Sequence, residues 1–87
     1  MRIFSRGTIS MWTEHHADGM HVVSEIDDDE MGFNSEVHYI ILPDELKKLY
    51  AIVSENEFIE ICRKGMSSGM EDFLTSHDIH YTRVPVR

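Results

Sequence analysis

One apolar run constrains the fold of this 87-residue chain more than any other feature: Val37-His38-Tyr39-Ile40-Ile41-Leu42, which ends at Pro43. The run is the most hydrophobic stretch of the sequence and is rich in β-branched and aromatic residues, which favour strands. Because apolar side chains fill nearly every position, the pattern is typical of a central strand that is buried on both faces. We therefore expect a sheet built around residues 37–42.

Two strands joined by a hairpin turn are predicted ahead of that run. Residues 2–13 alternate around Gly7, which we interpret as a bulge or bend within a single strand. The pair Asp18-Gly19 suits the positive φ values of a type I′ turn, so residues 20–26 should return as the second strand.

That turn also predicts the register of the hairpin. Met11 should lie opposite Ile26 on the core face, and Trp12 should lie opposite Glu25 on the other face. An acidic loop over residues 27–35 then leads into the apolar strand.

Three helices are predicted after the apolar strand. The first begins at Pro43, because proline suits the first helical turn and the acids that follow it favour the helix N-terminus. Capping boxes, in which a serine and the glutamate three residues later exchange hydrogen bonds, predict where the other two helices begin. These boxes are Ser54 with Glu57, and Ser68 with Glu71; the second helix should end at Gly65.

The last segment, Ile79 to Val86, is predicted to be a strand, and Pro85 places it at a sheet edge. The expected fold class is therefore α+β, in the order β-β-β-α-α-α-β, with a four-stranded, mostly antiparallel sheet and two or three short helices on one face. Residues 1–87 should form a single domain with an acidic, strand-rich half (1–42), a helical half (43–78) and a C-terminal strand (79–87).

The net charge of −8 is distributed unevenly along the chain. Residues 7–46 contain ten acids and no Lys or Arg, whereas acids and bases balance from Lys47 onward. Direct binding of nucleic acid through the acidic half is disfavoured because phosphates would be repelled.

Six histidines suggest an alternative function, a metal-binding or metal-responsive module. The predicted hairpin places His16 opposite His21, with Glu14 diagonal to them, and these side-chain types suit zinc or another transition metal. Three or four ligands do not converge at a recognised spacing, however, so we expect no bound metal and no cofactor. Cys62 lies on an apolar helical stripe, which is typical of a buried structural thiol.

The charge segregation instead indicates a non-enzymatic protein-binding module. An acidic surface steers association with a basic one, so the partner is expected to be a basic protein surface, as in an inhibitor or antidote that covers a nucleic-acid-binding site. Exposed apolar groups beside the acids would anchor the contact. The residues expected to contact the partner are Trp12, Glu25, Asp27, Asp28, Asp29, Glu30, Met31 and Phe33.

A third interpretation is a small structural subunit that self-associates as a homodimer. No segment has the length and hydrophobicity of a membrane span, and a single cysteine is typical of a reducing compartment, so we expect a cytoplasmic protein. Paired carboxylates that would mark an enzyme do not stand out from the other acids.

Overall fold

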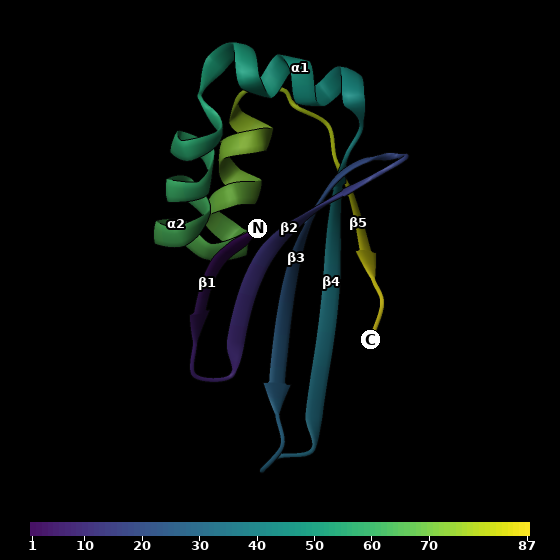
Figure 1. Ribbon diagram of the computed structural model, residues 1–87, viewed down its shortest axis with the longest axis vertical. Coiled ribbons are helices and arrows are strands. Elements are labelled where there is room, and N and C mark those ends of the chain that lie inside the picture. The colour runs from purple at the N-terminus through teal and green to yellow at the C-terminus, as the bar shows by residue number, and fades with distance from the viewer.

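The computed structural model describes residues 1–87 as an α+β fold in which two helices cover one face of a five-stranded antiparallel sheet (Figure 1). The strands follow one another across the sheet in chain order. They are β1 (Arg2–Arg6), β2 (Ile9–His16), β3 (Gly19–Asp28), β4 (Phe33–Ile41) and β5 (Thr82–Pro85). The helices are α1 (Pro43–Ile52) and α2 (Glu55–Ser76). The predicted fold class is confirmed, although the sheet has one strand more than expected.

The extra strand arises because the first predicted strand is a hairpin. Gly7 has a φ of 60°, and the chain reverses there, so Ser5 pairs with Ser10 and Arg6 with Ile9. A bulge and a tight turn both call for a glycine with positive φ, so local sequence does not distinguish them. The prediction of a single strand over residues 2–13 was wrong.

The register between β2 and β3 also differs from the prediction. His16 pairs with Gly19, so the turn is centred one residue earlier than expected, and Trp12 lies opposite Val23 instead of Glu25. Gly19 is needed at the first position of β3 because a Cβ there would lie 2.2 Å from the Ile41 carbonyl oxygen. The slip amounts to two residues on β3, and an even slip keeps every side chain on its predicted face.

Burial of β4 alternates along the strand, which corrects the expectation that residues 37–42 are buried on both faces. Tyr39 and Ile41 are buried under the helices, whereas His38 and Ile40 are partly exposed to solvent and Leu42 is exposed. The reason is that the helices form a layer on one face of the sheet only. The strand also begins earlier than predicted, at Phe33, so the acidic loop shrinks to residues 29–32.

The capping box that starts α2 is confirmed. The backbone N–H of Glu57 donates to Ser54 Oγ over 3.1 Å, and the backbone N–H of Ser54 donates to Glu57 Oε1 over 2.9 Å. The second capping box is absent, since Ser68 Oγ donates to the Gly65 carbonyl and Glu71 accepts from the Tyr81 hydroxyl. The prediction for Ser68 was therefore wrong.

A break within α2 lies next to the predicted helix end at Gly65. Met66 has non-helical backbone angles (φ 58°, ψ −154°), and the chain doubles back there into a second helical half (Figure 1). A Cβ placed on Gly69 would lie 4.0 Å from the Ile61 carbonyl oxygen. In a continuous helix those residues would be about 12 Å apart along the axis, so the two halves must lie side by side.

The core lies between the helices and the covered face of the sheet. Its fully buried members from the sheet include Met11, Met20, Val22 and Ile41, and those from the helices include Leu49, Phe58, Cys62, Met70 and Leu74. β5 pairs only with β4 and so occupies a sheet edge, as Pro85 predicts. No helix is long and apolar enough to cross a membrane.

Candidate functional site

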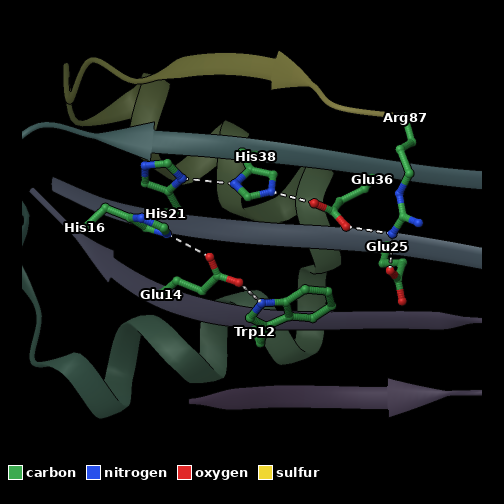
Figure 2. Close-up of polar contacts among 8 residues, drawn as sticks. All are labelled: Trp12, Glu14, His16, His21, Glu25, Glu36, His38 and Arg87. Atoms are coloured by element: carbon green, nitrogen blue, oxygen red, sulfur yellow. Dashed lines mark hydrogen bonds and ion pairs between the residues drawn. The ribbon is translucent and has the colours of Figure 1, made fainter. Parts of the chain in front are cut away.

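The sheet face that lacks helices, here called the open face, carries a nearly continuous chain of polar contacts (Figure 2). Strand alternation brings together side chains from β2, β3 and β4 on this face, and the C-terminal residue reaches it from the end of β5. The packing is close enough that Val23, whose cross-strand partners are Trp12 and His38, is fully buried without any helix above it.

A pair of histidines stands at the centre of this chain. Nδ1 of His21 and Nδ1 of His38 are 2.9 Å apart, and the two rings meet edge to face. The outer nitrogen of each ring bonds to a carboxylate at 2.8 Å, His21 Nε2 to Asp18 and His38 Nε2 to Glu36. These contacts lower the pKa of the Asp18 and Glu36 carboxyls, in each case chiefly through the hydrogen bond from the histidine. Both acids are therefore ionised acceptors at neutral pH.

Glu14 joins β2 to the histidine pair. One of its carboxylate oxygens accepts from the indole N–H of Trp12, and the other bonds to His16 Nε2, both over 2.7 Å. These two bonds lower the pKa of Glu14, with the Trp12 bond contributing most. The His16 ring in turn lies 4.0 Å from the ring of His21, between centroids.

Arg87 closes the other end of the chain. Its guanidinium donates to Glu25 and Glu36, each over 2.8 Å, and the backbone of Glu36 holds the C-terminal segment in place. One base that lies more than fifty residues away in sequence thus pairs with two acids of the acidic half and offsets part of their charge.

Within residues 1–42, the acids that have no ion-pair partner lie at the end of the β3–β4 hairpin. We call this region the acidic tip: Asp27, Asp28, Asp29, Glu30, Met31 and Phe33. None of its acids forms an ion pair with a basic side chain, and Asp28 Oδ1 accepts from the backbone N–H of Met31. Met31 and Phe33 are 79% and 53% exposed. The tip projects at the end of the molecule opposite the helices (Figure 1).

The structure thus divides the residues predicted to contact a partner into two groups. Six of them form the acidic tip, whereas Trp12 and Glu25 lie on the open face, half-buried and bonded to other residues. Trp12 and Glu25 also border a shallow cleft of about 410 Å³. The remaining residues that line this cleft are Met1, Arg2, Phe4, Ser10 and Met11.

The residues of the alternative metal site, Glu14, His16 and His21, do lie close together. Their donor atoms bond to one another or to neighbouring protein groups, and no group of three or more His, Cys, Asp or Glu side chains has a geometry that could hold a metal ion. Cys62 is fully buried, and desolvation raises the pKa of its thiol to about 12. A thiol of this kind is a poor nucleophile at neutral pH.

Sequence reasoning missed His38, Asp18, Glu36 and Arg87 as members of the open-face network. His38 was assigned to a core strand, and the pairing of β4 with β3 that brings it to His21 is a long-range contact. Alternation within residues 34–40 offered the available signal, because Glu36, His38 and Ile40 must share a face of any strand.

Comparison of the chain with protein-family models, curated proteins and solved structures finds no match. Function is therefore inferred from the chain's own residues.

Proposed function

We propose that the chain is a non-enzymatic protein-binding module whose acidic tip docks on a basic surface of a partner protein. A basic surface of the kind that binds nucleic acid is the natural complement, which would make the chain an inhibitor or antidote that covers such a site. Asp27, Asp28, Asp29 and Glu30 would supply the attraction, and Met31 and Phe33 the apolar anchors.

The observation that carries the proposal is the charge imbalance at the tip. Elsewhere on the sheet the acids have partners, since Glu14, Glu25 and Glu36 accept hydrogen bonds from Trp12, histidine or Arg87. The four consecutive acids of the tip have no basic partner within the chain. Like charges held together in this way repel one another, and a basic partner would relieve that repulsion.

Exposed apolar side chains within the acidic patch support binding over simple solvation. Charge complementarity mainly raises the association rate, whereas desolvated apolar and aromatic anchors hold the complex together. Met and Phe are both enriched at protein interfaces. Met31 lies within four residues of every acid of the tip and Phe33 within six, so one contact could use both kinds of group.

The open face would extend this contact. Glu25 and Asp27 occupy alternate positions of β3 and so point to the same face, and Glu25 borders the cleft beside Trp12. A partner seated on the tip would reach Glu25 and Trp12 if it also covered this end of the open face.

The test compares two variants that remove the same charge from different places. Asp29→Asn with Glu30→Gln removes two charges from the tip, and Asp72→Asn with Asp78→Asn removes two exposed charges from the helical end of the molecule. Proteins retained by the wild-type chain from its native host would be identified, purified and measured for association rate against salt concentration. A photo-crosslinking residue in place of Met31 would report direct contact.

The proposal expects a basic partner that crosslinks to position 31. The tip variant should associate roughly ten-fold more slowly at low salt, with a flatter salt dependence, and the control variant should match wild type. Equal association rates for the two variants would refute the electrostatic docking. So would a partner that crosslinks nowhere near the tip.

A further inference from the structure

The contact between His21 and His38 joins two nitrogen atoms of the same kind, and this sets a strict condition on their protons. A hydrogen bond needs one donor and one acceptor, and a neutral imidazole has one of each. The two Nδ1 atoms are 2.9 Å apart, which is hydrogen-bonding distance.

The outer nitrogens of the pair, the two Nε2 atoms, can act only as hydrogen-bond donors. His21 Nε2 faces Asp18 and His38 Nε2 faces Glu36, both at 2.8 Å, and an ionised carboxylate only accepts. Each Nε2 must therefore carry a hydrogen. If both rings were neutral, two Nδ1 lone pairs would face each other and no hydrogen bond would form. If both rings were fully protonated, two Nδ1–H groups on two cations would face each other, and again no hydrogen bond would form.

We propose that a single proton bridges His21 Nδ1 and His38 Nδ1, so that the pair carries one positive charge and acts as a pH-sensitive clamp between β3 and β4. The bridged pair lies between two carboxylates, in the order Asp18, His21, His38, Glu36. Loss of the bridging proton or gain of a second one removes the bond, so the clamp holds only over a band of pH. This inference rests on the geometry of the pair and does not depend on the proposed binding function.

The surroundings of the pair favour the singly charged state. Glu14 and His16 face it from β2, Asp18 from the hairpin turn, Glu36 from β4, and Glu25 with Arg87 from beyond Glu36. The cross-strand neighbours from β5, Thr82 and Val84, are uncharged, and the helices cover the opposite face. Carboxylates at both ends stabilise one cation, whereas a second cation would lie against the first and close to the His16 ring.

Solvent has little access to the bond. The side chains of His21 and His38 are 11% and 15% exposed, so water cannot readily replace a lost hydrogen bond. A buried polar contact that loses its proton is unfavourable, and the least costly response is for one ring to rotate away. That rotation would break the bond to Asp18 or Glu36 and loosen the β3–β4 pairing on the open face.

Nitrogen NMR of the wild-type protein tests the bridge directly. With ¹⁵N-labelled histidine, and with chelator present to exclude adventitious metal ions, we expect a scalar coupling between the two Nδ1 atoms near pH 7, and Nε2–H signals for both rings. The coupling should vanish in acid, where the pair gains a second proton, and in alkali, where it loses the bridging one. Two rings that titrate independently, without the coupling at any pH, would overturn the proposal.

Stability measurements provide the second test, with His38→Gln compared against His80→Gln. His80 is 78% exposed and its only polar side-chain contact is a 3.8 Å ion pair with Asp78, so it serves as a matched control. Near pH 7 we expect His38→Gln to lower the folding equilibrium constant by roughly ten-fold, the usual contribution of a hydrogen bond to a charged group. The deficit should shrink toward the control value at both pH extremes. A deficit that does not vary with pH would refute the clamp.

Zinc provides the third test, because a metal ion could replace the bridging proton. Titration with Zn²⁺ alone should leave the Nδ1 coupling intact, since no third ligand converges on the pair. Loss of the coupling at one zinc per chain would show that zinc displaces the bridging proton, and would overturn the assignment of the pair as a clamp that responds to pH alone.

Discussion

Gly19 offers the sharpest test of the fold, because the hairpin register depends on it. Its φ of 130° lies in a region that residues other than glycine rarely adopt, and a Cβ would lie 2.2 Å from the Ile41 carbonyl oxygen. Real Cβ atoms essentially never come closer than 3.0 Å to such a neighbour. The neighbour is backbone of β4, so no rotamer change relieves the overlap.

The cost of Gly19→Ala combines two terms. Backbone strain contributes about 1–3 kcal/mol. Separating β3 from β4 at the cross-strand pair Met20–Ile41 adds to this free-energy cost, since both residues are fully buried. We expect a total loss of about 3–5 kcal/mol, near the upper limit for single substitutions. A chain of this size has a modest core, so the variant should be close to unfolding at 25 °C.

Gly32→Ala is the matched control. Gly32 also has a positive φ, 67°, but a Cβ there would meet nothing within 4 Å. Its cost should be about 1 kcal/mol, from the left-handed conformation alone. Urea unfolding followed by circular dichroism measures both variants. If Gly19→Ala costs no more than Gly32→Ala, the close approach to Ile41 is wrong and so is the observed register.

Three further predictions concern the ends of α2. Ser54→Ala should lower the free energy of unfolding by about 1 kcal/mol through loss of the N-terminal cap, measured by urea unfolding at pH 7. The hydrogen bond from the backbone N–H of Ser54 lowers the pKa of Glu57. The contribution of Glu57 to stability is therefore present above the ordinary carboxyl range of pH and is lost as pH falls. Glu57→Gln should accordingly approach wild-type stability in acid. At the other end, Asp78→Gly should stabilise the protein, for the reasons argued below.

The fold class could be predicted because it depends on local patterns. Alternation around Trp12 and helical spacing after Pro43 are each contained within a few residues, and the Ser54 capping box is a four-residue motif that forms as predicted. The assignment of faces within β2 and β3 also survives, because the error in register was even.

Most of the wrong predictions depend on contacts between distant segments, and the local exceptions are the turn at Gly7 and the absent cap at Ser68. The hairpin register depends on the approach of Ile41 to Gly19, and burial of residues 37–42 depends on how many layers cover the sheet. The open-face network is the clearest case, because Arg87 reaches Glu25 only after β4 and the C-terminal segment have been placed. Local sequence patterns do not predict which distant residues will pair in this way.

The C-terminal end of α2 provides the last prediction, because a residue with positive φ ends the helix. The helix closes with a Schellman motif: the N–H of Ile79 donates to the Leu74 carbonyl over 2.9 Å, and the N–H of Asp78 donates to the Thr75 carbonyl over 3.2 Å. Asp78 occupies the left-handed position, with a φ of 56°, where glycine is preferred. Its side chain is 90% exposed, so its removal leaves no cavity.

Three terms set the effect of Asp78→Gly. Relief of the left-handed conformation favours the variant by about 1 kcal/mol, and removal of a negative charge from a helix C-terminus adds about 0.3–1 kcal/mol. The greater freedom of glycine in the unfolded chain opposes them by about 0.4–1 kcal/mol. The net gain should be about 0.3–1.6 kcal/mol by urea unfolding. Asp78→Asn removes the charge and keeps the side chain, so it should gain less than glycine. A glycine variant less stable than wild type would mean that the left-handed cap at Asp78 is not the conformation in solution.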